Sequence, residues 1–150
     1  MSRCSEVMTM NPVCCLPDET VDKAAQFMKS EDVGSIPVVQ DRQSNRLIGI
    51  VTDRDLAMRV VAERRDAETT KVREVMTPNP VTCRANDDLR MALNAMAQHK
   101  VRRIPVVDES GSVIGIIAQA DVATRADEPT KTAELVKEIS IPSETGEVRA

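Results

Sequence analysis

The sequence predicts an α+β fold built from two copies of one strand–helix–strand–strand–helix unit. The first observation is an internal repeat: when the chain is slid along itself, Glu6–Cys15 aligns with Glu74–Cys83, and Val33–Val39 aligns with Val101–Val107. The second is an apolar stripe of helical spacing in each copy, and the third is a pair of short apolar runs after each stripe. Two occurrences indicate two copies of one unit, since a solenoid needs about three or more.

Each copy contains one clear amphipathic helix. Its apolar residues recur at i, i+3, i+4 and i+7, which line one face of an α-helix. They are Val21, Ala24, Ala25 and Met28 in the first copy, and Leu89, Ala92, Leu93 and Met96 in the second. Polar and acidic residues just ahead of each stripe supply caps and negative charge for the helix start. A second helix is expected over Asp53–Glu63 and over Gln119–Arg125.

A β-hairpin follows each amphipathic helix. Ile36–Val39 and Ile104–Val107 are short β-branched runs, and a polar turn separates each of them from a second apolar run. Pro37 and Pro105 interrupt these first hairpin strands. Because proline has no backbone N–H to donate, both prolines should lie at a strand edge or at a strand start.

The chain divides into two repeats joined by a polar bridge. We assign residues 6–63 to the first repeat, 64–73 to the linker, 74–125 to the second repeat, and 126–150 to a C-terminal helix and tail. One repeat alone has short strands and buries little surface, so packing of the two repeats through their sheets would complete the core. Thr130–Ile139 has apolar residues at helical spacing, which predicts a terminal helix that docks on the pair or on a partner.

The composition excludes several functions. The chain has one Phe, no Trp and no Tyr, so it lacks the aromatic platforms on which single-stranded nucleic acids stack, and its net charge of −4 offers no basic field for a phosphate backbone. No apolar run is long enough for a signal peptide or a membrane span, so we expect a cytoplasmic protein. We expect no enzyme activity, because the only histidine is His99 and no nucleophile–base set or glycine-rich phosphate loop is present.

The four cysteines do not match the usual spacings of zinc ligands. They are Cys4, Cys14, Cys15 and Cys83. The simplest interpretation is that they are small buried thiols in a reducing compartment. Metal binding, or a redox response that uses the last three, stays open as an alternative.

The sequence resembles the CBS-domain family, named after cystathionine β-synthase. The resemblance covers about residues 6–125 and rests on Val-Met-Thr ahead of Asn-Pro-Val, on the Ile-Pro-Val-Val strand, and on the run Gly49–Leu56. These motifs occur in order and most occur twice, as in small stand-alone proteins made of one tandem CBS pair. The resemblance implies a module with pseudo-two-fold symmetry and two clefts that commonly hold AMP, ADP, ATP or a related adenosine ligand. It also implies that two modules form a flat dimer.

The family's ribose-binding motif, Ser/Thr-x-x-Asp, matches Thr52 and Asp55. A carboxylate suits this role because it accepts hydrogen bonds from the paired ribose hydroxyls, and a helix N-terminus favours its charge. The same two residues also match a capping box, in which they would only cap the helix. In the second repeat Ala118 replaces the threonine while Asp121 keeps the acid, which favours a ligand role. The second cleft departs from the family pattern, so it is expected to bind more weakly, bind another ligand or stay empty.

By the same resemblance, basic residues ahead of the first hairpin strand reach the phosphates. This assigns Arg102 and Arg103 to phosphate binding, with His99 as a lesser candidate. The alternative is an exposed strand end whose arginines only solubilise it. The adenine is expected between apolar residues that would also suit any core: Val13, Cys14, Ile36 and Pro37 for the first cleft, and Val81, Thr82, Ile104 and Pro105 for the second.

We therefore predict a regulatory sensor module, of the kind used in energy sensing, that binds an adenine nucleotide between two CBS repeats and changes its conformation or its partner binding. The nucleotide is a regulatory ligand, and no obligatory cofactor or metal is expected. The expected partners are an adenosine-containing small molecule, an unidentified protein and a second copy of the chain, which would cover the apolar helix residues Leu56, Val60 and Val61. Nucleic acids and membranes are not expected as partners. The alternative is a structural, thiol-responsive or metal-responsive adaptor with vestigial clefts.

Overall fold

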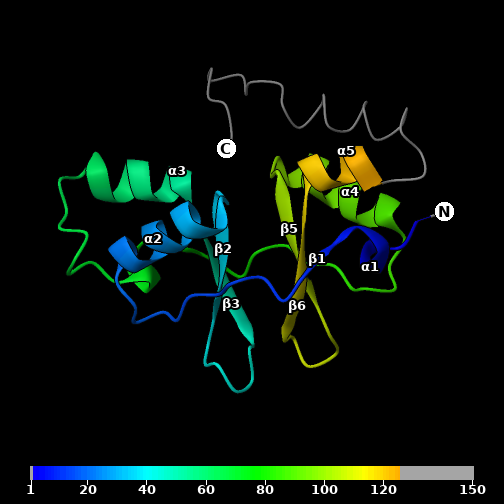
Figure 1. The fold of residues 1–150 in the computed structure, drawn as a ribbon, viewed down its shortest axis with the longest axis horizontal. Helices are drawn as coiled ribbons and strands as arrows, with labels where there is room; N and C mark the ends of the chain where they lie inside the picture. Colours follow the sequence, from blue (N-terminus) through cyan, green and yellow to red (C-terminus); the bar gives the residue numbers. More distant parts are fainter. Residues whose placement is uncertain (1, 126–150) are drawn as a thin grey trace. The chain divides into compact units, whose positions relative to one another are not determined.

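The computed structural model describes residues 2–125, which form two compact units (Figure 1). Each unit contains a three-stranded sheet with helices packed on it, so the predicted α+β class is confirmed. None of the helices described is both long enough and apolar enough to cross a bilayer. The predicted terminal helix, Thr130–Ile139, lies outside the described residues.

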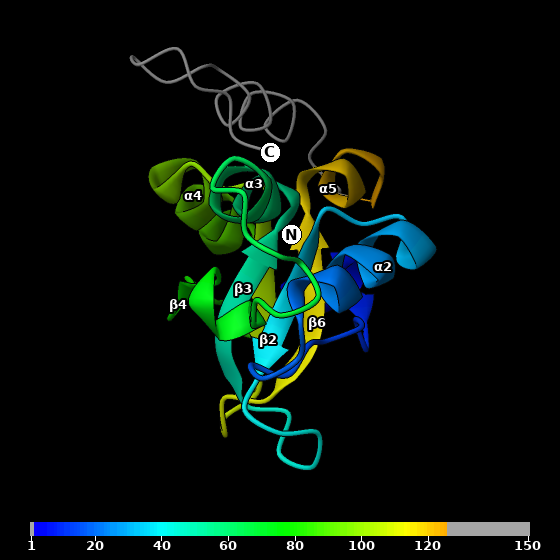
Figure 2. The same cartoon turned by 90° about the vertical axis from the view of Figure 1, so that its left-hand side faces the viewer.

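The α2 unit comprises residues 12–80 and 110–113. Its strands form a sheet in the order β2-β3-β4 (Figure 2). Strand β2 is antiparallel to β3, with Ile36 opposite Val51. Its elements are helix α2 (Val21–Glu31), strands β2 (Ser35–Val39) and β3 (Leu47–Thr52), helix α3 (Asp53–Leu56), the π-helical turn η1 (Ala57–Val61), the 3-10 turn η2 (Val72–Glu74) and strand β4 (Thr77–Pro78).

The α4 unit comprises residues 2–11, 81–109 and 114–125. Its sheet has the order β1-β6-β5, and β1 runs antiparallel to β6 with Thr9 opposite Ile116. Its elements are helix α1 (Cys4–Val7), strand β1 (Thr9–Met10), helix α4 (Leu89–His99), strands β5 (Arg103–Val107) and β6 (Val113–Ala118), and helix α5 (Gln119–Arg125). The first residue of β6 is grouped with the α2 unit.

Each unit combines residues of both sequence repeats. Strand β1 precedes the first repeat's amphipathic helix but pairs with β6 of the second hairpin, and β4 precedes the second repeat's helix but pairs with β3 of the first. The duplicated Val-Met-Thr motif explains these pairings: a Cβ added to Gly115 would lie 2.6 Å from the sulfur of Met8, and a Cβ on Gly49 would lie 2.6 Å from the sulfur of Met76. Each methionine therefore packs where only a glycine leaves space.

The amphipathic helices face the cores as predicted, with one exception. In α4 all four residues of the stripe are buried, and in α2 three are buried, but Ala25 is exposed. The prediction for Ala25 was therefore wrong; the buried face of α2 is the narrower stripe of Val21, Ala24 and Met28. The hairpin prolines lie on edge strands, β2 and β5, which confirms their predicted placement.

The second helix of the first repeat differs from the prediction. The expected helix over Asp53–Glu63 is a short α-helical segment followed by a π-helical turn that ends at Val61. In the turn the Ala62 N–H bonds to the Ala57 carbonyl (2.9 Å), and Arg64 then takes a left-handed conformation with φ of 56° that stops the helix.

This geometry also corrects the expected apolar helix face. Val60 is only 3% exposed and already lies in the core of its own unit, and Leu56 is half-buried against that core. The π-helical turn instead exposes Met58 (52%) and Val61 (73%). Of the three residues expected to be covered by a second copy, only Val61 is exposed.

Candidate ligand site

The Thr52–Asp55 motif begins helix α3, directly after strand β3. The Thr52 hydroxyl accepts a hydrogen bond from the Asp55 N–H (3.0 Å), and the Asp55 carboxylate accepts one from the Thr52 N–H (2.9 Å). Both halves of a capping box are therefore present. The box positions both side chains at the helix N-terminus, where four N–H groups favour an acceptor or an anion.

Capping does not use all of the acceptor capacity of Asp55. Its Oδ2 atom receives the Thr52 N–H, whereas Oδ1 lies 3.9 Å from the Nε atom of Arg59. Arg59 also donates to the Val75 carbonyl at 3.0 Å, so its guanidinium is shared. A carboxylate offers about four lone-pair sites. Asp55, which is 9% exposed, can therefore cap the helix and still accept a further donor.

A buried hydroxyl beside this motif was not selected from the sequence. Ser35 begins strand β2, lies opposite Thr52 in the β2–β3 ladder, and is 5% exposed. Its Oγ atom has no hydrogen-bond partner within the described part of the chain. A buried polar atom without a partner costs free energy. The Ser35 hydroxyl is therefore a further polar group available to a ligand at this end of the hairpin. Its only sequence signal was its alignment with Arg103 of the second repeat.

The predicted adenine residues of the α2 unit belong to two different apolar clusters. Val13 packs against the cluster that contains Ile36, whereas Cys14 lies in a separate cluster with Val39. Pro37 is buried, and its carbonyl accepts the Cys15 N–H at 3.0 Å, which holds the segment that precedes α2 against β2. The structure therefore brings Val13 and Ile36 together but places the Cys14 side chain elsewhere.

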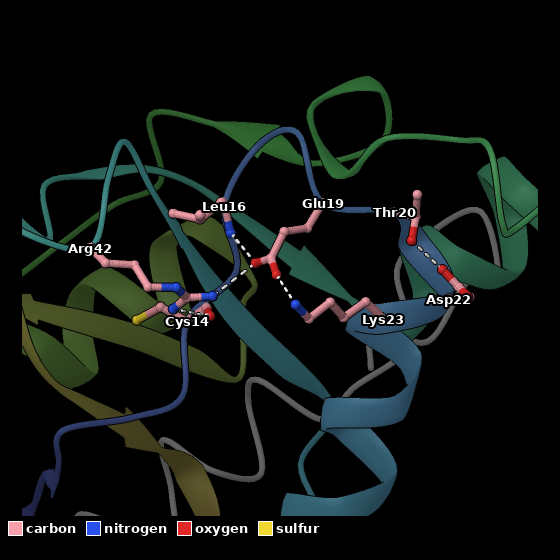
Figure 3. A network of polar contacts seen from close by, with 7 residues as sticks. All are labelled: Cys14, Leu16, Glu19, Thr20, Asp22, Lys23 and Arg42. Atoms are coloured by element: carbon pink, nitrogen blue, oxygen red, sulfur yellow. Dashed lines mark hydrogen bonds and ion pairs between the residues drawn. The ribbon is translucent and has the colours of Figure 1, made fainter.

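A network of charged groups holds that segment in place (Figure 3). The Glu19 carboxylate accepts the Leu16 N–H (2.7 Å) and contacts Lys23 (2.5 Å) and Arg42 (3.0 Å), and Arg42 also donates to the Cys14 carbonyl (3.4 Å). Burial of Glu19 opposes its ionisation, but the hydrogen bonds from Lys23 and Leu16 outweigh burial and lower the pKa of Glu19. This network was not predicted from the sequence, because Arg42, in the turn between β2 and β3, is distant in the chain from Glu19 and Lys23.

Replacing Glu19 with glutamine should destabilise the protein at neutral pH by roughly 1 kcal/mol, because the ion pairs are lost. Since the pKa of Glu19 is lowered in the folded state, its charge stabilises the protein above the pKa of the unfolded chain, about 4.3. That stabilisation disappears as the pH falls through the folded-state pKa. The difference between Glu19→Gln and the parent protein should therefore shrink as denaturant unfolding is repeated from pH 7 to acidic pH. Glu109→Gln, at an exposed position, is the matched control, and a pH-independent difference would contradict the prediction.

In the α4 unit the equivalent helix start is different. Asp121 is half-buried in the first turn of α5, and the Gln119 N–H donates to the Arg102 carbonyl at 3.0 Å, just as Asp53 donates to Gly34 at 2.9 Å in the other unit. The residue ahead of the hairpin therefore contacts the helix start in both units. In the α4 unit that residue is an arginine.

The predicted phosphate-binding residues are placed unequally. Arg102 and Arg103 are half-buried, and the Nε atom of Arg102 is buried without a hydrogen-bond partner among residues 2–125. His99 is the exposed last residue of α4. Of these residues, Arg102 is the one whose backbone carbonyl bonds to the start of α5.

The predicted adenine residues of the α4 unit differ in burial: Ile104 and Pro105 are buried, Val81 packs against the core, and Thr82 is exposed.

The cysteines are all buried free thiols. Burial raises the pKa of Cys14 to about 11 and that of Cys15 to about 12, so these two thiols hold little thiolate at neutral pH. Within the described residues, no group of three or more His, Cys, Asp or Glu side chains could hold a metal ion.

The comparisons with known proteins agree with this geometry. A family model described as "CBS domain" matches residues 4–62 and 72–128, so this chain belongs to the CBS-domain family. The CBS domain-containing protein YhcV of Bacillus subtilis is 41% identical over 123 residues, which are 82% of this chain and 84% of YhcV.

Two solved structures show the same fold. Hypoxic Response Protein I, a protein of Mycobacterium tuberculosis solved with two coordinated zinc ions, is 32% identical with a TM-score of 0.74, over 82% of this chain and 98% of that one. The CBS domain protein PAE2072 of Pyrobaculum aerophilum, solved in complex with AMP, is 25% identical with a TM-score of 0.76, over 91% of this chain and 99% of that one.

Proposed function

We propose that this chain is a regulatory module that binds an adenosine nucleotide of the AMP type at the start of helix α3. The observation that carries the proposal is the buried Asp55 carboxylate, which keeps acceptor capacity beyond its cap. Ser35, opposite Thr52 in the β2–β3 ladder, adds a buried hydroxyl that has no hydrogen-bond partner among residues 2–125. Asp55 would accept hydrogen bonds from the ribose hydroxyls. The AMP complex of PAE2072 supports the choice of nucleotide.

We propose that the α4 unit offers a second, different site. Asp121 would take the ribose, as Asp55 does, and Arg102 and Arg103 would bind phosphate oxygens, which suit the planar guanidinium. The Nε atom of Arg102 supports this role, because it is buried without a hydrogen-bond partner in the described part of the chain and a phosphate oxygen would supply one. His99 is exposed at the end of α4 and contributes less.

The proposed activity is regulation by binding, in the cytoplasm, with the nucleotide as a ligand rather than a reactant. A ligand shifts a conformational equilibrium only if it binds one state more tightly than another. The output would then be a change in conformation or in the binding of a protein partner. The thiol-based alternative is weakened for Cys14 and Cys15 by their raised pKa values.

The test is calorimetric titration of the purified protein with AMP, ADP, ATP, NAD and S-adenosylmethionine. Binding of one ligand with a Kd in the micromolar range, about −8 kcal/mol, would support the proposal and identify the signal. No heat of binding from any of the five, with a folded protein, would overturn it.

We also propose that the chain forms a homodimer through the exposed side chains of η1. Met58 and Val61 lie on this one turn and are both largely exposed. Val61→Glu should convert a dimer into a monomer, because a dimer would have to bury the new charge. Light scattering coupled to size exclusion measures the mass, and Met91→Glu, at an exposed residue of α4, is the matched control. A parent protein that runs as a monomer, or dimers in both variants, would contradict this interface.

A further inference from the structure

Two thiols from distant parts of the chain meet in the core of the α4 unit. Cys4 lies in helix α1 and Cys83 lies ahead of α4, and both belong to one apolar cluster, with exposed fractions of 0% and 6%. The backbone holds them there, since the Cys4 N–H donates to the Asp87 carbonyl (3.0 Å) and the Ser5 N–H donates to the Ala85 carbonyl (2.9 Å). The Cys83 thiol itself donates to the Pro105 carbonyl (3.9 Å), so both thiols are held within this one buried cluster.

The internal repeat shows that the fold does not require this pair. The repeat aligns Cys83 with Cys15 and Cys4 with Val72. Cys15 and Val72 occupy the core of the α2 unit in the same way, and the Val72 N–H donates to the Glu19 carbonyl at 2.8 Å, as Cys4 does to Asp87. A valine therefore fills the position opposite the equivalent cysteine, and only the α4 unit has a second thiol there.

The contact makes the two thiols chemically unequal. The interaction with Cys83 lowers the pKa of Cys4, whereas the interaction with Cys4, together with burial, raises the pKa of Cys83. The thiolate is the nucleophile, and Cys4 also lies in the four-residue helix α1 near the N-terminus, so Cys4 is the attacking sulfur of the pair. Cys14 and Cys15 have pKa values raised by burial, so both are poorer nucleophiles.

We propose that Cys4 and Cys83 form a redox modification site, at which a small disulfide such as oxidised glutathione converts the two thiols into an intramolecular disulfide. The Cys4 thiolate attacks one sulfur of the small disulfide and releases one small thiolate, which leaves a mixed disulfide on Cys4. Cys83 then loses its proton to solvent, attacks the Cys4 sulfur and releases the second small thiol. The two cysteines are oxidised, and the small disulfide is reduced to two thiols.

The site is closed in the folded state, so the reaction requires local opening. Helix α1 has only four residues and is close to the N-terminus, which is where local opening is easiest. The disulfide would then tether the segment of residues 2–11, including strand β1, to the rest of the α4 unit.

The experiment uses the full chain, incubated in its native state with oxidised glutathione, trapped by alkylation and cut by a glutamate-specific protease. Cleavage after Glu6 and Glu19 separates Cys4 from Cys14 and Cys15, and the fragment from residue 75 to Glu109 contains Cys83. Mass spectrometry should find the fragment ending at Glu6 joined to the Cys83 fragment, with Cys14 and Cys15 alkylated. Reduction should separate the two fragments.

Two variants serve as controls. Cys4→Val introduces the residue that the α2 unit has at the equivalent position; it should fold and lose the link completely. Val72→Cys places a second thiol opposite Cys15 and should gain a link to it. The proposal is overturned if Cys4 and Cys83 stay alkylated under conditions in which Val72→Cys links to Cys15, or if Cys83 joins Cys14 or Cys15 instead.

Discussion

Replacing Asp55 with alanine should weaken AMP binding about 10- to 150-fold. The loss of a charged hydrogen-bond acceptor costs about 1.5–3 kcal/mol, which converts to that range of Kd. The test distinguishes two roles of Asp55, because its carboxylate also accepts a hydrogen bond from the Thr52 N–H and caps α3. Calorimetric titration of the variant and the parent protein with AMP measures the change directly.

The matched control is a second capping carboxylate. Asp88 begins α4, and its Oδ1 atom accepts the Arg90 N–H at 2.9 Å. Asp88→Ala should cost about 1 kcal/mol of stability, as the loss of a cap does, and should leave the affinity for AMP unchanged. If Asp55→Ala binds AMP as tightly as the parent protein, then Asp55 is only a helix cap and the proposed ribose contact is wrong.

Replacing Ile104 with alanine should lower the free energy of unfolding by about 2–5 kcal/mol. Ile104 is fully buried on β5, in the cluster that also contains Leu93, Met96 and Ile117. Truncation removes buried methyl groups and leaves a cavity that the close-packed neighbours fill only in part. The midpoint of denaturant unfolding, with the slope unchanged, measures the effect.

The control for Ile104 is a smaller truncation at the same position. Ile104→Val removes one methylene and should cost only about 0.5–1.5 kcal/mol. Both variants should fold, so AMP binding can be compared in them as well. A cost for Ile104→Ala no larger than that expected for Ile104→Val would show that this position is not part of a packed core.

The helices and hairpins were predictable from local patterns. The stripe of Leu89, Ala92, Leu93 and Met96 predicts one buried helical face, and all four residues are buried. The prolines predicted edge strands because proline cannot donate to a neighbouring strand. The exposed Ala25 and the π-helical turn before Ala62 escaped prediction, since the width of a buried face and the pitch of a helix depend on what packs against them.

The candidate site was predictable in part. The residues Thr52 and Asp55 followed from the motif and its resemblance to the CBS-domain family. Their double role, as cap and as available acceptor, followed only from the distances. Ser35 gave no local signal, because a serine at a strand start is ordinary until burial removes its water partners.

The sequence by itself determined that this protein contains two copies of one unit, which residues form the two amphipathic helices and the two hairpins, and which motif begins α3. Only the tertiary structure decided that β1 pairs with β6 and β4 with β3, and that Cys4 and Cys83 share one buried cluster. The physical reason is that periodicity and capping are local properties. The pairing of short strands and the meeting of two thiols depend instead on contacts between residues far apart in the chain, and no local pattern encodes these.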